Sequence, residues 1–119
     1  MQLKGKRVLL VEDEDLVAMW VEDMLFDLGC TVAARAANLP EALDKAREEE
    51  FDVALLDVSL NGKQVFPVAE LLTERGIPFA FASGYGPAGL PANFRGSLLV
   101  PKPFQIEELS KALSVALGQ

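Results

Sequence analysis

The sequence predicts an α/β fold in which a five-stranded parallel sheet is covered by helices on both faces. Short apolar runs alternate along the chain with stretches whose apolar residues recur at helical spacing. The apolar runs show little polar alternation, which is typical of strands buried on both faces. With 119 residues, half of them hydrophobic, the chain has the length and apolar content for one domain over 1–119.

The first half of the chain contains three predicted strands and two predicted helices. In order, these are a strand over 7–11, a helix over 14–28, a strand over 30–36, a helix that begins after Asn38, and a strand over 51–57. Gly29 is suited to end the first helix, and the Asn38 side chain can accept from the free N–H groups that begin the second. The apolar residues at helical spacing in the first helix are Leu16, Val17, Trp20, Val21, Met24, Leu25 and Leu28.

The second half continues the alternation with two further strands. A helix over 64–75 is ended by Gly76 and Pro78, and strands follow over 79–82 and 97–100. The last helix carries an apolar stripe made of Ile106, Leu109, Ala112, Leu113 and Leu117. Five strands connected in this way fit the doubly wound, flavodoxin-like (βα)5 fold, with strand order 2-1-3-4-5.

One stretch interrupts this rhythm. Residues 84–96 are rich in glycine and proline, both of which disfavour the interior of a regular helix. We therefore expect a mobile loop between the fourth and fifth strands, with a short fourth helix of one or two turns near 90–94.

The composition excludes several classes of function. The chain has no histidine, so it cannot form a Ser-His-Asp or Cys-His site, a histidine zinc site or a histidine phosphocarrier. Its net charge of −7 disfavours nucleic acid as a partner and favours a divalent cation or a basic protein surface. The lone Cys30, the lack of a signal peptide and the lack of a membrane-spanning apolar run together indicate a cytoplasmic protein.

Polar side chains follow four of the five predicted strands. They are the acidic run from Glu12 to Asp15 after the first strand, Asp57 at the end of the third, Ser83 and Gly84 after the fourth, and Lys102 after the fifth. Each has an ordinary explanation by itself, such as a helix N-terminus for the acidic run or a turn for Asp57. Because the carboxyl ends of parallel strands meet at one edge of a sheet, the four groups together indicate a site there.

The residue types at this edge favour phosphoryl transfer. Carboxylates that lie close together repel one another and call for a cation, and hard oxygen ligands suit Mg²⁺. In such a site the metal neutralises phosphoryl oxygens while a carboxylate attacks. A lysine and a hydroxyl hold the remaining phosphoryl oxygens.

Four motifs, in this order and at these spacings, give the whole chain a family resemblance. They are Val-Leu-Leu-Val-Glu12-Asp13-Glu14, Ala-Leu-Leu-Asp57-Val-Ser-Leu-Asn-Gly62, Phe-Ala-Ser83-Gly84 and Val-Pro-Lys102-Pro103-Phe104. With them, the chain resembles a bacterial response-regulator receiver (CheY-like) domain over essentially all of its residues. The resemblance implies a phosphoacceptor of a two-component phosphorelay, whose partner is a histidine kinase or a phosphotransfer protein.

The resemblance also implies a role for each site residue. Asp57 accepts the phosphoryl group. Mg²⁺ is ligated by Asp13, Asp57 and the backbone carbonyl of Ser59, while Glu12 acts through a water. Ser83, Gly84 and Lys102 bind the phosphoryl group, and the Lys102–Pro103 peptide is cis in the family.

The chain departs from the family pattern at the switch. Typical receivers carry an aromatic residue three positions before the lysine, where this chain has Leu99. The segment Pro-Phe-Ala-Phe-Ala-Ser83-Gly84-Tyr85 instead resembles a subgroup of single-domain receivers with a Phe-Ala-Thr-Gly-Tyr-like signature. Ser83 and Tyr85 are then the expected switch residues, unless the Tyr85 ring only covers the loop.

Several alternatives stay open at this point. The chain could be a stand-alone regulator without an output domain, which its ends favour, or the receiver of a hybrid histidine kinase. It could also be a pseudo-receiver that binds partners and takes no phosphate. A haloacid-dehalogenase-like phosphatase needs a second aspartate where this chain has Ser59. We expect no enzyme activity beyond phosphorylation and dephosphorylation of its own Asp57.

Overall fold

A five-stranded parallel sheet forms the centre of the computed structural model, which describes residues 3–84 and 89–118. Its strands are β1 (Arg7–Val11), β2 (Thr31–Ala36), β3 (Val53–Asp57), β6 (Phe79–Ser83) and β7 (Leu99–Pro101). They are arranged in the order β2-β1-β3-β6-β7, with every neighbouring pair parallel. Counted along this sheet alone, the order is 2-1-3-4-5, so the predicted fold class is confirmed.

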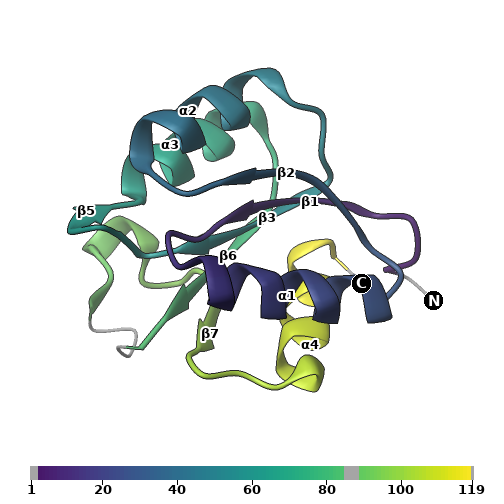
Figure 1. Ribbon diagram of the computed structural model, residues 1–119. Coiled ribbons are helices and arrows are strands. Elements are labelled where there is room, and N and C mark those ends of the chain that lie inside the picture. The colour runs from purple at the N-terminus through teal and green to yellow at the C-terminus, as the bar shows by residue number, and fades with distance from the viewer. Residues whose placement is uncertain (1–2, 85–88, 119) are drawn as a thin grey trace.

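Within the part of the chain that the structure describes, four α-helices cover the sheet in two layers. They are α1 (Asp15–Asp27), α2 (Leu39–Glu48), α3 (Phe66–Arg75) and α4 (Ile106–Ala116). Helices α1 and α4 cover one face, and α2 and α3 cover the other (Figure 1). The sheet therefore separates two apolar clusters, one beneath each pair of helices. Within the described residues, no helix is both long and apolar enough to span a membrane.

The predicted helix ends have clear physical causes. The Asn38 side chain accepts a hydrogen bond from the Glu41 N–H at 2.9 Å, which caps the start of α2. Gly76 ends α3 with a φ of 72°, a left-handed conformation that glycine adopts without a steric penalty. At the start of α4, Gln105 and Glu108 form a reciprocal capping box.

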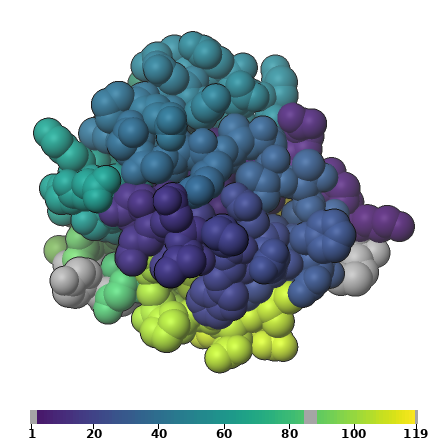
Figure 2. Space-filling model, viewed as in Figure 1, coloured from purple at the N-terminus to yellow at the C-terminus, as the bar shows by residue number. Residues whose placement is uncertain are grey.

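Helix α1 buries a narrower face than its apolar pattern predicts. Leu16 and Phe26 are 81% and 79% exposed, so Leu16 matches the helical spacing of the apolar residues but does not share their buried face. The buried face follows Ala18, Val21 and Leu25, and Leu16 falls on the far side of that stripe. Figure 2 shows the outer surface of α1 at the centre of the viewed side of the molecule, next to α4.

The remaining connections include one element that was expected and one that was not. The short helix expected near 90–94 is a three-residue 3₁₀ helix, η2 (Ala92–Phe94), which follows Pro91. A two-stranded antiparallel hairpin after β3 was not predicted; it consists of β4 (Ser59–Leu60) and β5 (Lys63–Gln64).

Candidate functional site

The carboxyl ends of β1, β3, β6 and β7 meet at one edge of the sheet, as the sequence predicts. Asp57 is the last residue of β3 and Ser83 the last of β6, while Glu12 follows β1 and Lys102 follows β7. A cavity of about 540 Å³ opens at this edge. Its lining includes Asp13, Asp57, Ser59, Ser83, Gly84 and Lys102.

Three carboxylates form an acidic cluster at the base of the cavity. One oxygen each from Glu12, Asp13 and Asp57 lies within 4.8 Å of the other two. Glu12 is only 3% exposed and Asp57 only 7% exposed, so water screens their mutual repulsion poorly. This donor set of hard oxygens beside an open cavity can hold a divalent cation together with water ligands.

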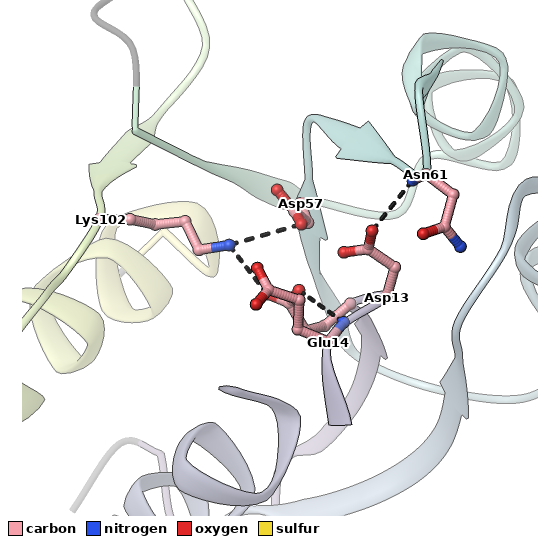
Figure 3. Close-up of polar contacts among 6 residues, drawn as sticks. Asp13, Glu14, Asp57, Asn61 and Lys102 are labelled. Carbon is pink, nitrogen blue, oxygen red and sulfur yellow. Dashed lines mark hydrogen bonds and ion pairs between the residues drawn. The ribbon is translucent and has the colours of Figure 1, made fainter. Parts of the chain in front are cut away.

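Among the described residues, Lys102 is the cation that lies against this cluster. Its Nζ lies 3.0 Å from Glu12 Oε1. The same Nζ lies 3.4 Å from Asp57 Oδ2 (Figure 3). Burial alone lowers the pKa of Lys102, but the hydrogen bond to Glu12 and the negative charge of Asp57 outweigh burial and raise it. Lys102 therefore stays protonated and bridges the two most buried carboxylates.

The environment of Asp57 favours its protonated form when no metal is present. Burial, followed by the negative charge of Glu12, raises the pKa of Asp57 from 3.8 to about 7, although the charge of Lys102 acts in the opposite direction. One lysine therefore does not balance the negative charge of the cluster. A divalent cation at this place would supply the missing positive charge.

Asp13 is held from the other side of the cavity. Its Oδ2 accepts a hydrogen bond from the backbone N–H of Asn61 at 2.9 Å (Figure 3). Burial raises the pKa of Asp13, but this hydrogen bond and others lower it by more than burial raises it. The pKa of Asp13 therefore lies below its ordinary value. The Glu14 N–H donates in turn to Glu12 Oε2 at 3.1 Å. These backbone donors orient the carboxylates before any ligand binds.

Of the remaining predicted site residues, Ser83 and Ser59 lie at the cavity, and Tyr85 is not among the described residues. Ser83 is buried at the end of β6, and its carbonyl accepts from the Lys102 N–H at 2.8 Å. The Lys102–Pro103 peptide is cis, as the family resemblance implies. Ser59 lies on β4 and lines the cavity. Tyr85, the second expected switch residue, lies outside the described residues.

Three features of this edge were not predicted from the sequence. One is the ion pair between Glu12 and Lys102, because no sequence pattern indicates which carboxylate a lysine approaches. The others are Gln64, which lines the cavity from β5, and Asn61, whose N–H donates to Asp13. The pair Asn61-Gly62 was an available signal, since Asn-Gly favours tight hairpins.

Comparison with known proteins agrees with this geometry. Residues 8–114 match the family described as response regulator receiver domain, and the chain belongs to this family. The solution structure of SdrG from Sphingomonas melonis Fr1 superposes with a TM-score of 0.84 at 38% identity, covering 95% of this chain and 97% of that one. The receiver domain of the PhyR response regulator from Erythrobacter litoralis gives a TM-score of 0.84 at 30% identity, covering 99% and 94% of the two chains.

A more distant relative is a longer protein. The transcriptional regulatory protein PdtaR of Mycobacterium tuberculosis is 26% identical over 118 residues, which cover 96% of this chain and 58% of PdtaR. The chain thus spans little more than half the length of this relative. This chain itself is a receiver domain of the response-regulator type.

Proposed function

We propose that this receiver is a phosphoacceptor that takes a phosphoryl group from the phosphohistidine of a histidine kinase or phosphotransfer protein onto Asp57. The observation that carries the proposal is the place of Asp57, buried at the floor of the cavity between two further carboxylates and Lys102. In the transfer, an Asp57 carboxylate oxygen forms a bond to phosphorus as the bond from phosphorus to the histidine nitrogen breaks. The protein then acts on no substrate other than its own phosphorylated side chain.

The acidic cluster fits Mg²⁺, because it combines hard oxygen donors with an open cavity that leaves room for water. We assign Asp13, Asp57 and the Ser59 carbonyl as the protein ligands. When bound, Mg²⁺ supplies positive charge that neutralises phosphoryl oxygens. The ion pair of Glu12 with Lys102 supports an indirect role for Glu12, through a water.

Lys102 and Ser83 have complementary parts in this proposal. The Lys102 ammonium carries three donors, so it can turn one toward a phosphoryl oxygen while it keeps its bond to Glu12. The Ser83 hydroxyl and the backbone at Gly84 lie at the same cavity and can hold a second oxygen. Movement of Ser83 toward the phosphoryl group, together with Tyr85, is the proposed switch.

The outer face of α1 is the proposed docking surface for the kinase or phosphotransfer protein. Leu16, Met19 and Phe26 expose apolar side chains there, and α1 begins beside the acidic cluster. An exposed apolar stripe of this kind fits the helices of a partner protein.

The test is intact mass after incubation with Mg²⁺ and acetyl phosphate. We expect one phosphoryl group on the wild type and none on Asp57→Asn or in the absence of Mg²⁺. Asp44→Asn, at an exposed carboxylate on α2, is the matched control and should be phosphorylated like the wild type. An adduct that persists on Asp57→Asn would refute the acceptor assignment. If neither acetyl phosphate nor a phosphorylated histidine kinase modifies the wild type, the pseudo-receiver alternative replaces the proposal.

A further inference from the structure

The hairpin β4–β5 is a rigid arm beside the proposed phosphoacceptor. Asn61 and Gly62 form its two-residue turn with φ values of 52° and 84°, the left-handed conformation that a tight type I′ turn requires. Leu60 anchors the arm in the core, where it is almost fully buried. At the tip, the Asn61 N–H is bonded to Asp13. The arm is therefore fixed both to the core and to the acidic cluster.

The register of the hairpin decides which side chains face the cavity. Residues directly opposite in an antiparallel pair point to the same face, and successive residues alternate between faces. Ser59 pairs with Gln64 and Leu60 pairs with Lys63. Because Leu60 points into the core, Ser59 and Gln64 point the other way, and both line the cavity that holds Asp57.

Gln64 brings a chemical group that the other cavity side chains lack. Among the described residues that line this cavity, it is the one side-chain amide. An amide offers an acceptor and donors at the same time, so it can accept a hydrogen bond from a water while donating one to a phosphoryl oxygen. Lys102 can only donate, and it is engaged with Glu12 and Asp57.

We propose that Gln64 holds the water that hydrolyses the aspartyl phosphate at Asp57 and so sets the lifetime of the phosphorylated state. This inference rests on the proposed phosphorylation of Asp57. The water oxygen forms a bond to phosphorus and the bond from phosphorus to the Asp57 oxygen breaks, returning its electron pair to the carboxylate. A water proton passes to a phosphoryl oxygen, and inorganic phosphate leaves. Glutamine orients the attacking water in the same sense in some phosphoryl-transfer enzymes.

The test measures the decay of the phosphorylated protein after acetyl phosphate is removed, with Mg²⁺ present throughout. Gln64→Leu keeps the size of the side chain and removes its donor and acceptor, so we expect the first-order decay to slow by about tenfold. Lys63→Leu is the matched control, because it changes the neighbouring residue on the opposite face of the hairpin, and its decay should equal that of the wild type.

A second readout separates water positioning from a structural effect. Trifluoroberyllate, BeF₃⁻, mimics the bound phosphoryl group, and its affinity should be the same for Gln64→Leu and the wild type. Unchanged decay in Gln64→Leu overturns the proposal, and so does a slower decay accompanied by an equal loss of BeF₃⁻ affinity. If the wild type itself takes no phosphoryl group, the proposed function has failed and this inference fails with it.

Discussion

Lys102 lies closer to Glu12 than to Asp57, with Nζ distances of 3.0 Å and 3.4 Å. Glu12 is almost fully buried, and its other oxygen accepts a hydrogen bond from the Glu14 N–H. The lysine therefore pairs with the buried Glu12 carboxylate as well as facing the proposed acceptor. It is held in place before any phosphoryl group arrives.

This arrangement predicts that Lys102→Met destabilises the fold as well as impairing phosphorylation. Without the ammonium, the buried Glu12 carboxylate loses its cationic partner, and we expect the free energy of unfolding to fall by about 1–3 kcal/mol. Urea denaturation measures this cost. Lys111→Met, an exposed lysine on α4, is the control and should leave the midpoint unchanged; equal midpoints for both variants would contradict the structural role of Lys102.

Asp57 predicts a pH dependence of stability in the absence of Mg²⁺. Its pKa is about 7 in the folded protein and near the ordinary 3.8 when unfolded, so the folded state binds its proton more tightly. Its stabilising contribution is therefore fully present below about pH 4 and is lost as the pH rises to about 7. Asp57→Asn removes this dependence. Between about pH 4 and pH 7, the free energy of unfolding of Asp57→Asn should therefore rise relative to that of the wild type. We expect this difference to grow by about 1–2 kcal/mol, because water reaches the pocket and screens part of the effect.

Mg²⁺ provides the control for this pH effect. A bound cation favours the charged form of Asp57, so saturating Mg²⁺ should narrow the gap between the two proteins at pH 7. A gap that is constant from pH 4 to pH 7, measured by thermal or urea unfolding, would show that Asp57 titrates normally in the fold.

Substitution of Gly62 in the hairpin turn should cost stability, whereas substitution of Gly96, outside the hairpin, should not. At Gly62 the φ is +84°, and an added Cβ would meet nothing within 4 Å, so Gly62→Ala is penalised by backbone conformation alone. We expect a loss of about 1 kcal/mol. Gly96 has equally open surroundings and no positive φ, so Gly96→Ala should be neutral or slightly stabilising. Equal stabilities in calorimetry would contradict the turn conformation.

Helix α1 predicts a sharp contrast between two neighbouring residues. Leu25 is fully buried and Phe26 is 79% exposed. Leu25→Ala leaves a cavity in the core and should lower the free energy of unfolding by about 2–5 kcal/mol, whereas Phe26→Ala should change it by less than about 0.5 kcal/mol. Denaturant titration of the two variants tests the orientation of α1; similar losses in both would mean that the helix is rotated.

Much of this architecture could be predicted because its causes are local or periodic. The strand β3 is continuously apolar and ends at Asp57, and Gly76 and Asn38 mark helix boundaries by their backbone and capping preferences. The convergence of Asp13, Asp57, Ser83 and Lys102 then follows from parallel topology, since all the carboxyl ends of the strands share one edge.

The features that could not be predicted depend on three-dimensional packing. Leu16 matches the apolar spacing of α1, yet only packing against α4 and the sheet decides which stripe is covered. The choice of Glu12 as the nearer partner of Lys102 depends on side-chain geometry at the cavity floor. The hairpin had a local signal in Asn61-Gly62, but four residues of strand are too few to show a period.

The contact between Trp20 and Phe104 has a practical consequence. The two rings are stacked with centroids 5.9 Å apart, and Phe104 follows Lys102 by two residues. Trp20 is the only tryptophan in the chain, so all indole fluorescence comes from this one position beside the site. Any event that displaces the segment 102–104 will alter the surroundings of the indole. The protein thus contains its own optical reporter, readable in real time without a label.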